Sequence, residues 1–221
     1  MDSEEQISPL SRAVFLDRDG VINHMVYNAE FGLVDSPANP EQFVLFESVG
    51  EAISEFNNLG FRVIVVSNQP GIAKGKFNAD LLDAMTDKMT AAIQCDGGEV
   101  DATYYCLHHP QSSLSEYALK CGCRKPRPGL LLQAAKEWNI DLKQSYMVGD
   151  GITDIIAGQA VGATTLLISS RKCYICDSLA EHNVTPDYMV ANLSEAAHLI
   201  QNIEADNADS VALYKFGCEI N

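Results

Sequence analysis

Short apolar runs recur along the 221-residue chain and alternate with longer amphipathic stretches. The runs have the length of strands, are rich in β-branched residues, and occupy residues 13–17, 62–67, 102–106, 145–149 and 163–168. Continuously apolar strands are typical of parallel sheets that helices cover on both faces. The alternation therefore predicts an α/β fold with a doubly wound, mainly parallel sheet.

Three amphipathic stretches between these runs have apolar residues at helical spacing. Their apolar stripes are Val49, Ile53, Phe56 and Leu59 in the first, Leu81, Leu82, Met85, Met89 and Ile93 in the second, and Leu130, Leu131, Ala134 and Trp138 in the third. Gly60 is placed to end the first helix, and Asn78 is placed to cap the start of the second. We expect the stripes to form core rather than to bind a cofactor.

Two carboxylates, Asp17 and Asp19, follow the first apolar run directly. In extended backbone residues i and i+2 project to the same side, so we expect both acids to face one small volume while Arg18 points away. In open α/β sheets ligands bind at the carboxyl ends of the strands. Two acids this close repel each other unless a cation lies between them or one is protonated. The pair predicts a Mg²⁺-assisted site with a nucleophile and a proton shuttle, and a plain turn after a strand is the alternative.

Further polar groups stand beside the ends of other predicted elements. Ser67 and Asn68 close the second run and offer a hydroxyl and an amide to a phosphate, Lys125 precedes the third helix, and Asp150 follows the fourth run. Ser67 and Asn68 could instead cap the next segment, Lys125 could be a solvated charge, and Asp154 could cap or line a helix rather than bind metal. Together and in this order, the groups predict a phosphoryl-transfer site.

Four possible metal ligands form two pairs, Cys106-x-His108 and Cys121-x-Cys123, which enclose the 12 residues 109–120. Three thiolates and one imidazole are a common ligand set for structural Zn²⁺, and the spacing of one residue suits extended backbone. Buried free thiols or a disulfide are the alternatives. Seven cysteines and an N-terminus unlike a secretory signal argue against disulfides, so we predict a zinc-binding loop.

Several other segments receive no chemistry from the sequence. Cys173 and Cys176 form a second, weaker pair that we interpret as ordinary buried thiols, with a redox or metal role as the alternative. His109 could replace His108 as a ligand, touch a substrate or end a strand. Residues 24–42 predict a loop beside the acids. The tail after about residue 202 could be disordered or dock as a short strand through residues 211–216.

Taken together, the motifs Asp17-x-Asp19-Gly20, Ser67-Asn68-Gln69, Lys125 and Gly149-Asp150 resemble those of the haloacid dehalogenase superfamily of aspartyl-phosphate phosphatases. Within it, Cys106-x-His108-His109-Pro110 and Cys121-x-Cys123-Arg124-Lys125-Pro126 resemble the branch of heptose-bisphosphate and histidinol phosphatases. The match runs from about Val14 to about Ile168. It implies a Rossmann-like haloacid dehalogenase fold with a zinc-binding loop and no large cap domain.

The resemblance implies that a phosphomonoester is hydrolysed in two steps. Asp17 would form a phospho-aspartate, and Asp19 would protonate the departing oxygen and then deprotonate the hydrolytic water. Asp17, the backbone carbonyl of Asp19 and Asp150 would bind Mg²⁺. Lys125 would supply fixed positive charge beside the phosphoryl group.

The resemblance also implies a substrate. Ser67 and Asn68 would hold the phosphoryl group, and Arg124 would contact a second phosphate or the sugar. The expected substrate is D-glycero-D-manno-heptose 1,7-bisphosphate, cleaved at C7, with histidinol phosphate or another small sugar phosphate as the alternative. The sequence departs from close members of this branch at Gly151, where a lysine is usual.

Composition limits the possible partners. With 15 basic and 30 acidic residues the chain carries a formal charge of −15, which disfavours nucleic acid as a partner. No run approaches the roughly 20 apolar residues of a membrane span. We therefore expect a monomeric cytoplasmic enzyme for a small phosphorylated sugar, folded as one domain over residues 1–221 with a core of about 13–200. A non-catalytic, zinc-stapled binding protein with the same fold is the alternative from another class.

Overall fold

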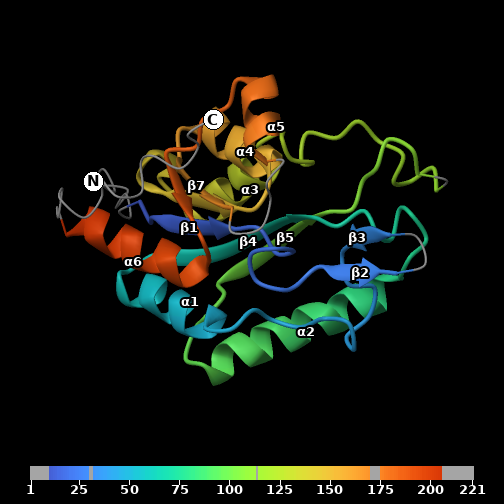
Figure 1. Ribbon diagram of the computed structural model, residues 1–221, viewed down its shortest axis with the longest axis horizontal. Helices are drawn as coiled ribbons and strands as arrows, with labels where there is room; N and C mark the ends of the chain where they lie inside the picture. Colours follow the sequence, from blue (N-terminus) through green and yellow to red (C-terminus); the bar gives the residue numbers. More distant parts are fainter. Residues whose placement is uncertain (1–9, 30–31, 113, 170–174, 206–221) are drawn as a thin grey trace, which may run out of the picture.

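The apolar runs form the strands of a six-stranded sheet in which every pairing is parallel. The computed structural model describes residues 10–29, 32–112, 114–169 and 175–205 (Figure 1). Across the sheet the strands are β5 (Ala102–Cys106), β4 (Arg62–Asn68), β1 (Ala13–Leu16), β6 (Tyr146–Gly149), β7 (Thr164–Ile168) and β8 (Tyr188–Val190). The predicted doubly wound, parallel sheet is confirmed, with β8 as a further strand that the sequence pattern did not reveal.

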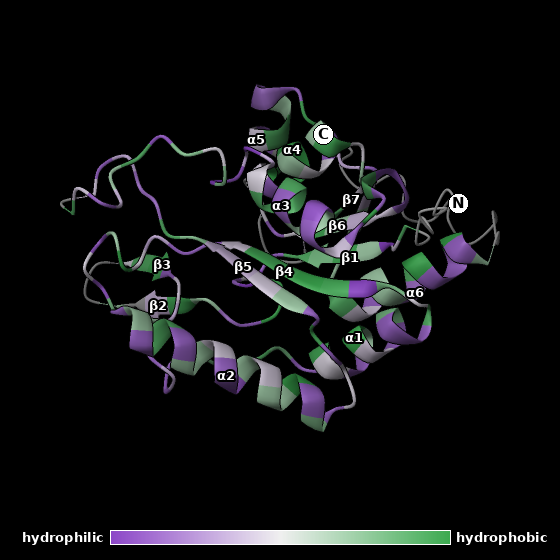
Figure 2. Ribbon diagram, turned by 180° about the vertical axis from the view of Figure 1, so that it is seen from behind, coloured by the Kyte–Doolittle hydropathy of each residue, from purple (hydrophilic) through white to green (hydrophobic). Residues whose placement is uncertain are grey.

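Helices cover both faces of this sheet (Figure 1). One layer contains α1 (Val49–Asn58), α2 (Ala79–Cys95) and α6 (Leu193–Glu204), and the other contains α3 (Gly129–Trp138), α4 (Ile152–Val161) and α5 (Ile175–His182). A short 3₁₀ helix, η1 (Leu142–Gln144), precedes β6. Figure 2 shows β1 and β4 mostly in the colours of hydrophobic residues, whereas α1 and α2 carry alternating hydrophobic and hydrophilic bands.

Side-chain alternation along β1 connects the two layers. Val14 and Leu16 belong to the core beneath α1, α2 and α6, while Ala13 and Phe15 pack in the core beneath α3 and α4. All four are fully buried, because successive residues of a strand project to opposite faces and both faces are covered. The strand that carries the catalytic motif is therefore fixed from both sides.

The three predicted helices are present, with the expected ends. Asn78 caps α2, since its Oδ1 accepts a hydrogen bond from the backbone N–H of Leu81 at 3.0 Å. Gly60 follows α1 with φ of 82°, a left-handed conformation that glycine adopts without strain. Local sequence chemistry thus sets the boundaries of both helices.

The prediction of a loop throughout residues 24–42 is wrong in part, because this segment contains an antiparallel hairpin of β2 (Val26–Asn28) and β3 (Leu33–Asp35). Its apolar residues Tyr27, Leu33 and Val34 are between 61% and 64% exposed. A hairpin that buries so little apolar surface needs no regular alternation of apolar and polar residues, so the sequence pattern does not reveal it.

Some expectations fall where the structure gives no description. Cys173, the side chain of Cys176 and the possible strand at residues 211–216 lie outside the described residues. Within the described ranges, no second folded unit interrupts the sheet as a large cap would. None of the helices in those ranges combines the length and apolar character needed to cross a lipid bilayer. A single domain over 1–221, a monomer and a cytoplasmic location stay predictions.

Candidate active site

The predicted catalytic groups meet at the carboxyl edge of the sheet. Asp17 directly follows β1, Ser67 and Asn68 end β4, and Asp150 directly follows β6. Because β4, β1 and β6 are adjacent and parallel, these residues share one edge. The Asp17 N–H donates to the carbonyl of Val148 at 3.0 Å, which ties the start of the motif to β6. Strand order reverses direction here, as at ligand-binding crevices of open α/β sheets.

Lys125 reaches this edge from the segment before α3 and is buried. Its Nζ lies 3.0 Å from Asp17 Oδ1 and 2.6 Å from Asp154 Oδ1, and it donates a hydrogen bond to the carbonyl of Val66 at 2.7 Å. Burial acts to lower the pKa of Lys125, but the carboxylates of Asp154 and Asp17 outweigh it, so the pKa is raised. Lys125 is thus a fixed cation inside the site rather than a solvated loop charge.

Three carboxylates, those of Asp17, Asp150 and Asp154, each place an oxygen within 4.8 Å of the others. The pKa of Asp154 is raised to about 7, because burial and the charges of Asp17 and Asp150 outweigh the opposing effect of Lys125. Asp154 also caps α4, because Gly151 N–H donates to its Oδ2 at 3.0 Å. Converging, partly buried acids with one lysine between them suit a hard cation such as Mg²⁺.

Gly20 permits the close approach of the motif to Asp150. Its φ is 87°, and a Cβ at this position would lie 2.0 Å from Asp150 Oδ2. Both the left-handed backbone and the contact therefore require glycine.

We expected the side chain of Arg18 to point away from both acids, but this is wrong for Asp19, which Arg18 contacts. Arg18 is fully buried, and its Nη2 lies 3.0 Å from Asp19 Oδ1. Strand alternation does send Arg18 to the face that Leu16 shares, but that face is covered by helices, so the guanidinium cannot reach solvent. It pairs with the nearest carboxylate instead.

Asn68, predicted to bind substrate, makes two hydrogen bonds to the backbone of Lys125. Its Nδ2 donates to the Lys125 carbonyl at 3.1 Å, and its Oδ1 accepts from the Lys125 N–H at 3.0 Å. Ser67 Oγ accepts a hydrogen bond from Gln69 Nε2 at 3.2 Å. The structure therefore shows the Asn68 side chain holding Lys125 in place, whereas its contact with substrate stays a prediction.

The four predicted zinc ligands also come together. Cys106 Sγ lies 3.6 Å from Cys121 Sγ and 3.2 Å from Cys123 Sγ, and His108 Nδ1 lies 3.3 Å from Cys123 Sγ and 3.7 Å from Cys106 Sγ. A tetrahedral ion with Zn–S bonds of about 2.3 Å needs ligand separations of about 3.8 Å. The set fits zinc, and the three cysteines are free thiols, so the disulfide alternative does not hold for them.

Cationic groups surround the entrance to the site. Arg124 directly precedes Lys125, and its Nη1 donates to the carbonyl of His108 at 3.3 Å. The pKa of His109 is lowered by burial and then by the charges of Lys74 and Arg124. Arg124 is therefore tied to the segment of the predicted zinc ligands, and its contact with substrate stays a prediction.

Gln69 is a residue whose importance sequence reasoning missed. It is buried, and its amide contacts Asp19, Ser67 and Arg18. Gln69 stands two residues beyond Ser67 in the motif Ser67-Asn68-Gln69. This position directly after a strand was the sequence feature that could have pointed to it.

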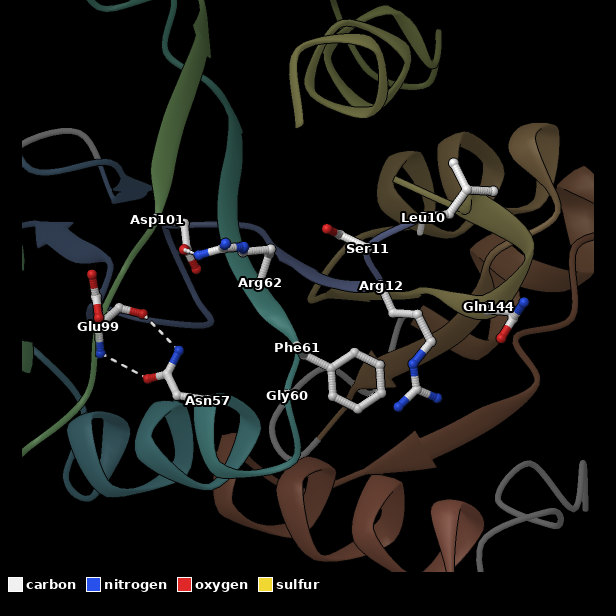
Figure 3. A pocket seen from close by; sticks show the side chains of 10 residues that line it. All are labelled: Leu10, Ser11, Arg12, Asn57, Gly60, Phe61, Arg62, Glu99, Asp101 and Gln144. Atoms are coloured by element: carbon white, nitrogen blue, oxygen red, sulfur yellow. Dashed lines mark hydrogen bonds and ion pairs between the residues drawn. The ribbon is translucent and has the colours of Figure 1, made fainter. Parts of the chain in front are cut away.

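A separate cavity of about 610 Å³ lies at the opposite, amino-terminal edge of the strands (Figure 3). Two of its charged groups pair with each other, since Arg62 Nη1 lies 2.6 Å from Asp101 Oδ1. Asn57 makes two hydrogen bonds to the backbone of Glu99 at 2.8 and 3.1 Å. None of the residues with predicted chemistry lines this cavity.

Comparisons with known proteins agree with this site. The family described as HAD-hydrolase-like matches residues 122–196. A D-glycero-beta-D-manno-heptose-1,7-bisphosphate 7-phosphatase from Yersinia pestis is 36% identical over 86% of this chain and 95% of its own length. The protein of that name from Escherichia coli K12 is 40% identical over 71% of this chain and 78% of its own.

Solved structures extend the likeness to the whole fold. A D,D-heptose 1,7-bisphosphate phosphatase from B. bronchiseptica, crystallised with magnesium and phosphate, superimposes with a TM-score of 0.70 at 28% identity. The match covers 87% of this chain and 99% of that one. Fold and site together define a phosphatase of the haloacid dehalogenase superfamily. Within that class, the chain belongs to the family of D-glycero-beta-D-manno-heptose-1,7-bisphosphate 7-phosphatases.

Proposed function

We propose that this phosphatase removes the C7 phosphate of D-glycero-D-manno-heptose 1,7-bisphosphate through a phospho-aspartate on Asp17. The observation that carries the proposal is the surroundings of Asp17. Its Oδ1 lies 3.0 Å from the buried ammonium of Lys125, and its carboxylate converges with those of Asp150 and Asp154. A carboxylate beside a fixed positive charge is a suitable nucleophile toward phosphorus.

The reaction then proceeds in two displacements at phosphorus. In the first, an Asp17 oxygen bonds to phosphorus as the bond to the C7 oxygen breaks, and Asp19 gives its proton to that oxygen. In the second, water attacks the phospho-aspartate, its proton passes to Asp19, and the bond between phosphorus and Asp17 breaks. Alcohol and phosphate leave, and both acids return to their starting state.

Charge compensation accompanies both steps. Lys125 faces the transferred group with its Nζ fixed by Asp17, Asp154 and the Val66 carbonyl. Mg²⁺, when bound by Asp17, Asp150 and the backbone carbonyl of Asp19, would neutralise charge on the acids and on the phosphoryl oxygens. The assignment is supported by Asp17 and Asp150, whose carboxylate oxygens lie within 4.8 Å of each other. The third nearby carboxylate, that of Asp154, pairs with Lys125 instead.

We assign Cys106, His108, Cys121 and Cys123 to a structural zinc ion. All four positions are occupied by protein ligands, which is typical of structural rather than catalytic zinc. The ion would fix the segment that leads into Arg124 and Lys125. Arg124, with Lys74 nearby, would bind the second phosphate or the sugar.

The substrate assignment is supported by the names of the relatives and by local charge. The chain as a whole carries a net charge of −15, so positive charge to attract a phosphate must come from individual residues of the site, which are Lys74, Arg124 and Lys125. Steady-state kcat/KM with Mg²⁺ on heptose 1,7-bisphosphate and on histidinol phosphate tests it. We expect preference for the heptose; preference for histidinol phosphate would overturn the assignment. If no small ester releases phosphate in a metal-dependent way, the non-catalytic binding protein is favoured.

A further inference from the structure

Buried side chains hold the carboxylate of Asp19 on both of its oxygens. Oδ1 accepts hydrogen bonds from Arg18 Nη2 at 3.0 Å and from Asn23 Nδ2 at 2.9 Å. Oδ2 accepts hydrogen bonds from Gln69 Nε2 at 2.6 Å and from Arg18 Nη2 at 3.2 Å. Gln69 is tied to Arg18 in turn, because its Oε1 accepts from Nη2 at 2.9 Å. Arg18 and Gln69 thus form a closed triangle with Asp19, and we call these two residues the Asp19 clamp.

The Asp19 clamp is costly for the fold. Arg18 is 0% and Gln69 is 1% exposed. Among the described residues, Arg18 Nη1 finds no hydrogen-bond partner. Burying a charge and leaving a donor unpaired both oppose folding, and well-packed apolar side chains at such positions are often at least as stabilising. Stability alone does not explain why these two polar groups lie in the core.

Two aromatic rings, on the face of the sheet that α1, α2 and α6 cover, pack against the guanidinium of Arg18. Its central carbon lies 5.4 Å from the ring centroid of Phe43 and 5.6 Å from that of Tyr105. Tyr105 is held by a hydrogen bond of 3.0 Å between its hydroxyl and Thr86 Oγ1. The clamp therefore rests on β5 and α2, and not only on the loop after β1.

We propose that Arg18 and Gln69 are positioning residues that orient the Asp19 carboxyl group for proton transfer. The inference rests on the proposed function, in which Asp19 gives a proton to the leaving oxygen as the phosphorus–oxygen bond breaks. Such transfer needs a carboxyl oxygen within hydrogen-bond reach of that oxygen. A carboxyl group without the clamp would rotate and hold this geometry for only part of the time. The two residues act through Asp19, and Asn23 completes the set.

The test compares two leaving groups in the variant Gln69→Leu. The alkoxide that leaves heptose 1,7-bisphosphate needs a proton, whereas the phenolate that leaves p-nitrophenyl phosphate does not. We compare kcat/KM, because it reports on steps up to the phospho-aspartate. We expect a fall of about 10- to 100-fold with the heptose and of less than about 3-fold with the aryl phosphate.

Two further variants sharpen the result. Arg18→Lys keeps the charge but cannot donate to both Asp19 and Gln69 in the same geometry, so we expect the same selective loss, smaller in size. Gln133→Leu is the matched control, because Gln133 is exposed and its side chain bonds to Glu137 of the same helix, α3. It should leave both activities unchanged. Activity on p-nitrophenyl phosphate also shows that each variant is folded.

The outcomes separate the inference from the proposed function. Equal losses with both substrates would indicate a merely structural role and overturn the inference, as would no loss with either. If the wild-type enzyme hydrolyses histidinol phosphate and not the heptose, the substrate assignment fails instead. The comparison of leaving groups is then made with histidinol phosphate, another alkyl ester, and retains its meaning.

Discussion

The amide of Asn68 bridges the backbone of Lys125, with hydrogen bonds of 3.1 and 3.0 Å to its carbonyl and N–H. Asn68 is the last residue of β4, whereas Lys125 follows the zinc loop and precedes α3. This contact therefore joins the rigid sheet to a segment that has no strand or helix of its own. The position of the Lys125 ammonium depends on it as well as on the ion pairs of Lys125.

We predict that Asn68→Ala lowers kcat by about 10- to 100-fold, because a misplacement of Lys125 by a fraction of an ångström weakens charge stabilisation in the transition state. Stability should fall by about 1–3 kcal/mol from the unpaired backbone groups. The matched control is Asn57→Ala, which removes the same two-point contact to the backbone of Glu99 at the other edge of the sheet. It should lose stability and keep kcat. Equal kcat losses in the two variants would contradict the role of Asn68.

We predict that Gly20→Ala strongly reduces activity. The added Cβ would lie 2.0 Å from Asp150 Oδ2, so the acid must move away from Asp17. Gly60→Ala is the control, because Gly60 has a similar φ of 82° and nothing within 4 Å of the added Cβ. Both should lose about 1–2 kcal/mol from left-handed backbone strain. Only Gly20→Ala should lose turnover and require more Mg²⁺, measured as the concentration for half-maximal rate.

The sequence predicted those parts of the site that depend on strand ends and on short spacings. Asp17, Ser67 and Asp150 each stand at the end of an apolar run, and parallel strands must bring such ends to one edge. The clustering of the four predicted zinc ligands followed from two one-residue spacings. These features depend on residues that are close in the sequence, so they can be recognised from the sequence alone.

The parts that were missed depend on contacts between distant segments. Asn68 and Lys125 are 57 positions apart, and no local pattern marks their pairing. The burial of Arg18 follows from strand alternation only once helices are known to cover that face. The hairpin in residues 24–42 escaped because its apolar side chains are exposed, so the usual link between hydrophobicity and burial is absent.

We predict that Cys121→Ser removes zinc and destabilises the protein, because one thiolate of a closed tetrahedral set is lost. The melting temperature should fall by about 10 °C, as a loss of about 3–4 kcal/mol would produce in a domain of this size. The kcat/KM should fall too, since Arg124 and Lys125 follow the loop. Cys95→Ser is the control, because Cys95 is exposed and outside the cluster. Zinc content by mass spectrometry should be one per chain in the control and near zero in Cys121→Ser.

We predict that Asp17→Asn abolishes turnover, by a factor of about 10³ or more, because an amide oxygen is a poor nucleophile toward phosphorus. The fold should survive, since asparagine has the same shape and its Oδ1 can still accept a hydrogen bond from Lys125 Nζ, now 3.0 Å from Asp17 Oδ1. Zinc content should be unchanged, because the thiolate cluster is a separate site. Acid quenching during turnover of labelled substrate should trap phosphate on Asp17 in the wild type and none in the variant. A variant that still turns over substrate, or a label on another residue, would refute Asp17 as the nucleophile.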